Sequence, residues 1–331
     1  MDFNLASLVV PDVDGGGRDV VESMNRVCDY TGGDLYGDIY NQSFTCKYYK
    51  NITKNQPFEF MTGRCKPSLS EHTTNKSLEE LKLELMLTVC SHHGAAFVID
   101  AIDPSGAMDQ RVYQEIGEAF EAIRPYESYF KGRMIEDIGV YYSCTSRFNP
   151  DGQKFSNHSC AIGLTKTLIQ NHVPVGILGN DGMQALTHYK MVFAPNLTAI
   201  PDQNAEALIR YVKNGGRLYF SGVQEKLLLE FFGAKQLGLT ESDVTYIAPK
   251  EKAGKLFGGY NGKYPMHIGF RLPLVGGISE EDVIASITLP YTCLLYTSSS
   301  SSMGSVREGR SKIFTGPYFV TVSPCASRDC T

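Results

Sequence analysis

Hydrophobic and polar positions along the first part of the chain form short runs that predict strands and helices in alternation. Residues 56–62 (QPFEFMT) predict a strand rich in aromatic side chains. Residues 95–100 (AAFVID) form an almost unbroken apolar run, as expected of a parallel strand buried on both faces. Apolar residues at helical spacing predict helices at 78–92 and 109–124. The order strand, helix, strand, helix predicts that the two strands are parallel.

The alternation of helix and strand is less clear in the residues that precede this unit. Residues 18–28 predict a helix, and residues 33–40 (GDLYGDIY) predict a strand. The segment 42–55 is polar and rich in tyrosine, and we interpret it as a loop with a short helix.

Beyond a seam at 130–136 the alternation restarts with more regular spacing. The clearest helix is 202–213, which starts at a Pro-Asp pair and stops before two glycines. Short apolar strands separated by helices predict an open, doubly wound sheet of flavodoxin-like type. The other expected elements are strands at 138–143, 173–178, 190–195 and 217–222 and helices at 158–171 and 181–188.

After about residue 233 the pattern weakens. Residues 243–249, 267–274 and 282–290 predict further strands, which we expect to be antiparallel additions. Five consecutive serines then occur without periodicity, and CLLYTS resembles the translation of a sequencing-library adapter. We therefore expect the protein's own coding sequence to be left near Cys293, and we base no function on residues 293–331.

Length and charge exclude several classes of protein. A chain of 331 residues, 42% of them hydrophobic, can bury two cores. A net charge of −5 does not favour binding to nucleic acid or to an anionic membrane. No apolar run approaches the roughly 20 residues that cross a bilayer, and the first residues are acidic where a signal peptide is basic. We expect a cytoplasmic protein.

Nine scattered cysteines contain no C-x-x-C pair, so we expect reduced, partly buried thiols and no zinc site of that type. The chain also lacks a dinucleotide-binding G-x-G-x-x-G, a phosphate-binding Walker loop and a G-x-S-x-G elbow. We expect no cofactor and no metal. His92 and His93 fall at a helix end, where we expect favourable interaction with the helix C-terminus.

Glu59 is the candidate catalytic carboxylate. Side chains alternate along a strand, so Phe58 and Phe60 point one way and Glu59 and Met61 the other. A carboxylate within an apolar parallel strand is costly unless it is paired or faces a polar space. In a βα-barrel, lumen-facing residues near the carboxyl ends of the strands form the active site. A structural ion pair or a supporting carboxylate is the alternative.

Candidate substrate-binding residues follow the two strands. Arg64, Glu71 and His72 lie in the loop after the first strand, where ligand contacts collect in barrels. Their side chains could hydrogen-bond sugar hydroxyls, and the alternative is that they are merely solvated. Asp100 lies at the end of the second strand; a simple turn at Asp103 is the other interpretation of that segment.

KMVFAPNLTAIPDQNAEALIRYVKNGGRLYFSG (190–222) resembles the trimerisation domain of glycoside hydrolase family 42, the bacterial β-galactosidases. EDIGVYYS (136–143) is similar to the strand that opens that domain, and 56–130 to the last two units of the preceding barrel. The similarity is closer to a subgroup of family-42-like hydrolases that share the sequence pattern EFM…EHTT.KS.EEL.LE…HGAAFVIDAIDP.G…VY..IGE.F. This resemblance covers about residues 1–292. In these enzymes a nucleophilic Glu follows a Met, but here Thr62 follows Met61, so that role does not carry over.

The resemblance implies an α/β chain with a partial (βα) barrel at 1–133, an amidotransferase-like, doubly wound trimerisation domain at 134–292, and a tail at 293–331. The strand order of the second domain is similar to that of class I glutamine amidotransferases. The matching turn, 194–198, lacks their cysteine nucleophile, so we do not expect that activity.

We therefore expect a fragment of a β-galactosidase-like glycoside hydrolase, inactive alone, that acts on a glycoside or oligosaccharide by a two-carboxylate mechanism. A homotrimer is the implied assembly. The alternatives are an oligomerisation module without chemistry, and a protein that binds a small anion at helix N-termini.

Overall fold

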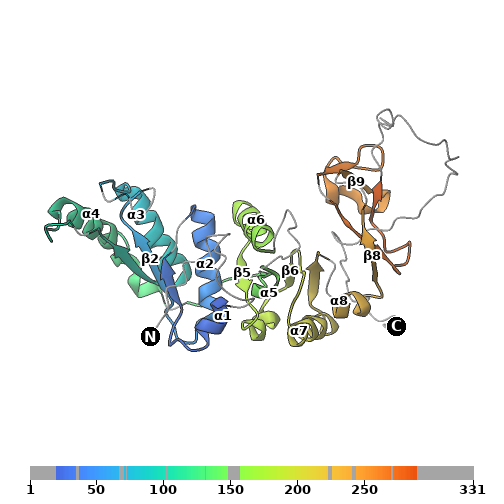
Figure 1. The fold of residues 1–331 in the computed structure, drawn as a ribbon, viewed down its shortest axis with the longest axis horizontal. Helices are drawn as coiled ribbons and strands as arrows, with labels where there is room; N and C mark the ends of the chain where they lie inside the picture. Colours follow the sequence, from blue (N-terminus) through green and yellow to red (C-terminus); the bar gives the residue numbers. More distant parts are fainter. Residues whose placement is uncertain are drawn as a thin grey trace.

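The computed structural model describes residues 20–34, 37–66, 71, 73–101, 103–130, 132–147, 157–222, 226–240, 244–269 and 271–288. Its elements form three groups along the long axis of the molecule: a small parallel sheet with helices, a four-stranded parallel sheet with helices, and short antiparallel strands (Figure 1). Helices and parallel strands alternate in the first two groups, as the sequence predicts. The predicted tail at 293–331 lies outside the described residues.

The first sheet consists of β1 (Gly32–Asp34), β2 (Glu59–Gly63) and β3 (Ala95–Ile99), in that order and all parallel. The strands lie side by side in chain order, as neighbouring strands do in a βα-barrel. The prediction of an α/β chain with a partial barrel is thus confirmed at this level. The predicted strand at 33–40 is shorter, because the chain turns into a helix after residue 38.

Two helices follow β2 and β3. The first, α3 (Leu78–Leu85), is capped by the hydroxyl of Ser77 and continues as the π-helix η2 (Met86–Ser91). The second, α4 (Gln110–Glu121), leads into the 3-10 helix η3 (Arg124–Tyr129). Buried side chains of α3 and α4, and of Ile123 just after α4, form a small apolar cluster with two residues of β3: Leu81, Leu85, Ala119 and Ile123 with Ala96 and Val98.

Helix α2 (Ile39–Ile52) replaces most of the predicted loop at 42–55, and α1 (Val20–Asn25) precedes it. The carboxylate of Asp38 caps α2 by accepting hydrogen bonds from the backbone N–H groups of Tyr40 and Asn41 at 3.0 and 2.9 Å. The prediction failed because polar and apolar residues of α2 are buried together, which removes the usual contrast between two faces.

The second sheet consists of β4 (Ile138–Tyr141), β5 (Val175–Leu178), β6 (Met191–Ala194) and β7 (Arg217–Phe220). Its order is β5-β4-β6-β7, and every neighbouring pair is parallel. The chain therefore reverses its direction of travel across the sheet at β4, as in doubly wound sheets. The flavodoxin-like and amidotransferase-like labels stay predictions.

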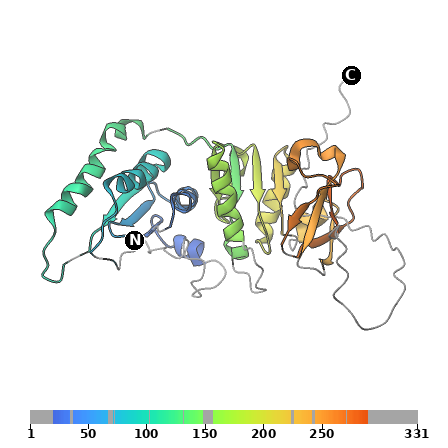
Figure 2. The ribbon, with the colours of Figure 1, turned by 90° about the horizontal axis from the view of Figure 1, so that it is seen from above.

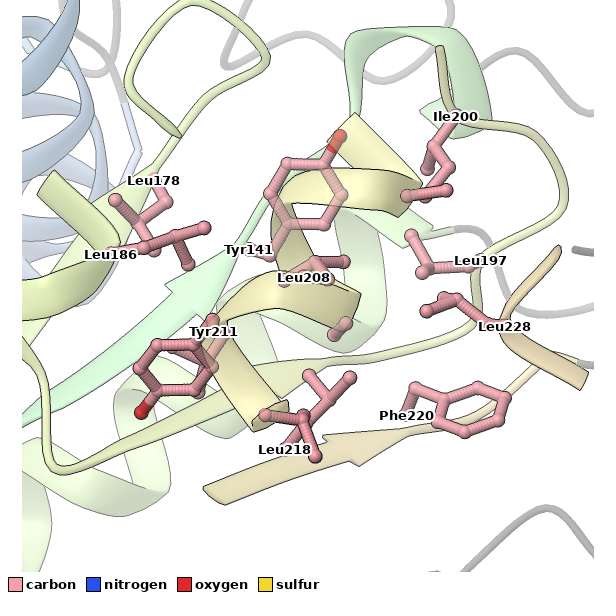
Figure 3. Close-up of a cluster of buried hydrophobic side chains, with 14 of the residues drawn as sticks. Tyr141, Leu178, Leu186, Leu197, Ile200, Leu208, Tyr211, Leu218, Phe220 and Leu228 are labelled. Atoms are coloured by element: carbon pink, nitrogen blue, oxygen red, sulfur yellow. The ribbon is translucent and has the colours of Figure 1, made fainter. Parts of the chain in front are cut away.

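Helices cover both faces of this sheet. Tyr141 points into the cluster formed with α7 (Asp202–Lys213) and α8 (Lys226–Phe231), where Leu208 and Tyr211 pack on the strands (Figure 3). The remaining helical segments of this part are α5 (Cys144–Arg147), α6 (Asn157–Gln170) and the 3-10 helix η4 (Met183–His188).

The opposite face of the second sheet packs on α2 as well as on α6. One cluster joins Phe44, Tyr48 and Phe60 of the first part to Val140 and Tyr142 of the second. Figure 2 shows α2 between the two sheets. The two parts of the chain thus share one buried cluster, because a helix encoded before the seam covers the sheet encoded after it. The boundary at 133/134 stays a prediction.

The third group contains antiparallel strands, as predicted. Strands β9 (Thr245–Pro249), β10 (Met266–Ile268) and β12 (Ala285–Thr288) form one sheet, and β8 (Lys235–Leu239) pairs with β11 (Pro273–Gly276). The predicted strand at 267–274 is divided between two sheets. The 3-10 segment η5 (Glu251–Phe257) packs Ala253 and Phe257 beneath β9. Among the described residues, no helix is long and apolar enough to span a bilayer.

Candidate functional site

Arg64 and Asp100 meet at the carboxyl end of the first sheet. The Nε of Arg64 donates a hydrogen bond to Asp100, and the two side chains are only 10% and 15% exposed. The Nη1 of Arg64 also donates to the backbone oxygen of Thr74 at 3.1 Å and to Asn75 Oδ1 at 2.7 Å. Arg64 is thus committed to joining the ends of β2 and β3 to the following loop, and its charge is balanced by Asp100.

The other two predicted loop residues are not brought into this contact. Glu71 is exposed, and His72 lies outside the described residues. The turn after β3 is formed as the alternative interpretation predicted: Asp103 accepts a hydrogen bond from the backbone N–H of Ser105 at 2.8 Å. Substrate binding by Arg64, Glu71, His72 and Asp100 therefore stays a prediction, and in the structure Arg64 and Asp100 form an ion pair with each other.

Glu59 is the first residue of β2, so it lies at the amino end of the sheet and not at the end that carries Arg64. The alternation was predicted correctly, since Phe58 and Phe60 are fully buried on the helix side. The hydroxyl of Tyr30 lies 3.4 Å from Glu59 Oε2 and donates to it. The catalytic role of Glu59 stays a prediction, and its position is the one that barrels use for stability.

A buried polar network behind β2 was not identified from the sequence. The ammonium of Lys76 donates to both carboxylate oxygens of Glu84, at 2.9 and 3.0 Å, and to Thr62 Oγ1 at 2.7 Å. Thr62 in turn donates to Glu84, and so does the side-chain amide of Gln42 on α2, both at 2.9 Å. The network fixes the carboxyl half of β2 against α2 and α3.

His92 corrects the sequence interpretation of the His-His pair. Its side chain is buried, with Nε2 at 3.3 Å from the hydroxyl of Ser43. Burial holds the pKa of His92 well below its usual value, and the positive charges of Lys47, Lys50 and His93 lower it further. A neutral imidazole gains little from the negative end of a helix, so the expected charge interaction is wrong for His92.

At the carboxyl end of the second sheet, hydrogen bonds join the loops that follow its strands. In doubly wound sheets, ligands bind beyond the carboxyl ends of the strands where the order reverses, which here is between β4 and β6. Asn157 accepts from the backbone N–H of Ser143 at 3.1 Å and donates to Pro195 O at 2.6 Å. Ser146 Oγ accepts from the backbone N–H groups of Thr198 and Ala199 at 3.1 and 2.9 Å. These groups are therefore satisfied by protein.

The turn after β6 has a left-handed residue, Asn196, at φ 48°. Gly222 comes so close to it that a Cβ there would lie 2.6 Å from the Asn196 Cα. An elbow conformation is thus present, but the side chain on it is an amide and not a nucleophile.

No group of three or more metal-binding side chains gathers within the described part of the chain. The described cysteines are free thiols, as predicted: Cys28, Cys46, Cys65, Cys90, Cys144 and Cys160.

Residues 149–227 match the model of the β-galactosidase trimerisation domain. No curated protein sequence matches the chain significantly. The sequence expectation for 190–222 is therefore supported by a match that covers that segment and extends toward the N-terminus.

Several solved structures share the fold. An α-L-fucosidase, isoenzyme 2 of Paenibacillus thiaminolyticus, has a TM-score of 0.63 at 17% identity and covers 85% of this chain and 42% of its own. The β-galactosidase of Rahnella sp. R3 has a TM-score of 0.60 at 17% identity, over 80% of this chain and 45% of its own. A catalytic mutant of Gan42B, a GH42 β-galactosidase of G. stearothermophilus, has a TM-score of 0.62 at 14% identity, over 82% and 44%.

The chain thus spans less than half the length of these structures. At such identities the likeness establishes the fold, and the domain match gives the family signal. Residues 149–227 are thus similar to the β-galactosidase trimerisation domain, and the chain as a whole has a fold similar to part of the family 42 β-galactosidases.

Proposed function

We propose that this chain is part of a glycoside hydrolase of the β-galactosidase type, which hydrolyses O-glycosidic bonds between two carboxylates. The observation that carries the proposal is the match of residues 149–227 to the β-galactosidase trimerisation domain. The parallel sheet that precedes this domain has its loop contacts at the carboxyl ends of the strands, where barrel enzymes hold substrate.

In this proposal Glu59 is the candidate nucleophile or stabilising carboxylate. Glu71 and His72 are candidate contacts to a glycoside, while Arg64 and Asp100 hold the rim on which such contacts form. No cofactor or metal takes part. The protein acts in the cytoplasm on an oligosaccharide or glycoside, independently of nucleic acid or membrane.

The sugar is a galactoside or a close relative of galactose. Two of the similar structures carry the name β-galactosidase, and another is named an α-L-fucosidase. L-Fucose is 6-deoxy-L-galactose, so the two sugars have the same relative arrangement of hydroxyls, in mirror-image form, and the test below compares both.

The test is hydrolysis of para-nitrophenyl β-galactoside and α-L-fucoside by the purified protein and by longer forms of it. We expect Glu59→Gln to lower kcat by about 100-fold or more if Glu59 reacts. Glu79→Gln, a change at an exposed position on α3, is the matched control and leaves turnover unchanged. Equal turnover in the Glu59→Gln protein removes Glu59 from the mechanism.

A second candidate function is oligomerisation without chemistry. It is favoured by the crevice between β4 and β6, where the side chains of Asn157 and Ser146 form hydrogen bonds with the backbone of neighbouring loops. Sedimentation equilibrium of the whole chain tests it: we expect a homotrimer, and a monomer at every concentration contradicts it.

A further inference from the structure

Asn214 and Gly215 end helix α7 in a tight turn, with Asn214 as the C-cap. The backbone N–H of Gly215 donates to Val212 O at 3.0 Å, and that of Gly216 donates to Tyr211 O at 2.9 Å. Gly215 has the positive φ, 94°, that this helix ending requires and that glycine adopts without strain. These two hydrogen bonds stop the helix and lead the chain into β7.

The side chain of Asn214 is exposed, and within the part of the chain that the structure describes it forms no hydrogen bond. Its Cγ is a carbonyl carbon that lies close in the chain to the backbone nitrogen of Gly215. Glycine has no side chain to hinder approach to that nitrogen. An exposed Asn-Gly turn therefore holds the nucleophile and the electrophile of an intramolecular reaction next to each other.

We propose that Asn214 is a site of spontaneous deamidation. The backbone nitrogen of Gly215 attacks Cγ of Asn214 and gives up its proton, a C–N bond forms, and the side-chain nitrogen takes the proton and leaves as ammonia. Water then opens the cyclic imide at either of its carbonyl carbons. The product carries a carboxylate in place of the amide, as an aspartate or as an isoaspartyl link in which the main chain runs through the former side chain.

A second Asn-Gly pair, Asn261 and Gly262, is also exposed, but its side chain is held by the protein. Asn261 Oδ1 accepts hydrogen bonds from the backbone N–H groups of Lys263 and Tyr264 at 2.9 and 3.0 Å. Its Nδ2 donates to Gly259 O at 3.2 Å. The amide of Asn261 must leave these bonds before its Cγ can meet the next backbone nitrogen, so the fold protects this pair.

The two pairs thus differ in what opposes the reaction. At Asn214 the described structure opposes it with the hydrogen bond from the Gly215 N–H to Val212 O, whereas at Asn261 the side chain itself is fixed by three hydrogen bonds. Each such bond contributes a modest net free energy, so the difference corresponds to a rate about tenfold higher at Asn214.

Deamidation changes the joint between α7 and β7. Tyr211 before the turn and Leu218 after it pack in the same buried cluster (Figure 3). An isoaspartyl link adds a carbon to the main chain, so the N–H groups of Gly215 and Gly216 move away from their acceptors. An ordinary aspartate is a milder change, because it only adds negative charge at the negative end of the helix dipole. The isoaspartyl product therefore loosens the start of β7.

The experiment is ageing of the full chain in mildly alkaline buffer, followed by digestion with pepsin at acid pH and mass spectrometry of the peptides. We expect the peptide that contains Asn214 to be deamidated about ten times faster than the peptide that contains Asn261. A chain unfolded in guanidinium chloride is aged in parallel, and there the two pairs react at similar rates because the hydrogen bonds are lost. Asn214→Gln keeps an amide at this position and should stay intact, because glutamine must close a larger ring.

Equal rates in the folded chain, or faster reaction at Asn261, overturn the proposal. A folded chain whose Asn214 stays intact while the unfolded chain reacts also overturns it, because the turn would then protect the pair. Hydrogen exchange tests the effect on the fold: we expect the aged protein to lose protection at Gly216 and at the start of β7, and the Asn214→Asp protein to keep it. Full protection in aged protein that contains the isoaspartyl link overturns this effect.

Discussion

The carboxylate of Glu22 accepts a hydrogen bond of 2.7 Å from the backbone N–H of Asn180, which joins α1 to the loop after β5. The hydroxyl of Tyr48 on α2 donates to the same oxygen at 2.8 Å. Three segments from two sequence regions thus converge on one buried carboxylate. The contact is possible because Gly179, beside Asn180, has no side chain.

Gly179→Ala should therefore destabilise the protein. A Cβ at this position would lie 2.7 Å from a Tyr48 ring carbon and 3.0 Å from an Ile52 methyl, so packed groups must move. We expect the free energy of unfolding to fall by about 1–3 kcal/mol, measured by urea denaturation. Gly163→Ala in α6 is the control: nothing lies within 4 Å of its added Cβ, and alanine favours a helix by about 0.5–1 kcal/mol. Equal effects of both changes would contradict the packing argument.

Glu84→Gln should destabilise the protein far more than the same substitution at an exposed position on α3. It leaves the ammonium of Lys76, whose side chain is 11% exposed, without its charged partner. Removing one partner of a buried ion pair costs about 3–5 kcal/mol. Glu79→Gln removes the partner of Lys82 in an exposed pair on the same helix, and we expect a change within about 0.5 kcal/mol. Thermal unfolding of the two variants gives the comparison, and similar melting temperatures would refute the role of the network.

His92 should make stability depend on pH. Burial, Lys47, Lys50 and His93 all lower its pKa, so below about pH 6.5 the unfolded chain binds a proton that the folded chain does not. Its contribution is complete above that pH and is lost as pH falls, by up to about 1.4 kcal/mol per unit. His92→Leu should remove this part of the slope between pH 7 and 5 in urea titrations. His172→Asn, a change of an exposed histidine, is the control variant. An unchanged slope in the His92→Leu protein would contradict the prediction.

Some elements could be predicted from the sequence because their signals are local. Helix α7 begins at Asp202 and ends at Lys213, as the apolar spacing and the flanking Pro and Gly residues predict. Helix α2 could not be predicted in this way. Lys47, Gln42 and Tyr48 are all buried in it, and a helix covered on several sides by other elements loses its amphipathic pattern.

The candidate site shows the same limit. The alternation around Glu59 is a local property and was predicted correctly, but the strand begins at Glu59 itself, and that places the carboxylate at the amino end. Strand limits are set by pairing with Gly32 and Ala95, which are distant in sequence. The Arg64–Asp100 and Lys76–Glu84 pairs likewise depend on how strands and helices come together, and spacing alone does not reveal them.

Phe44 and Tyr142 provide the last prediction, because they join the two parts of the chain through one aromatic contact. Their ring centroids lie 5.4 Å apart at an angle of 87°, an edge-to-face arrangement. Phe44 belongs to α2 and Tyr142 follows β4, and both are buried in the shared cluster. Phe44→Ala should lower the free energy of unfolding by about 3–5 kcal/mol.

The effect should extend beyond the helix that carries the change. Hydrogen exchange followed by mass spectrometry should show loss of protection in β4 and β5 as well as in β2, since all three pack on the same cluster. Phe257→Ala, in the separate cluster beneath β9, should leave β4 and β5 protected. Loss of protection confined to residues before the seam would mean that the two parts unfold independently, and that the contact between Phe44 and Tyr142 carries little free energy.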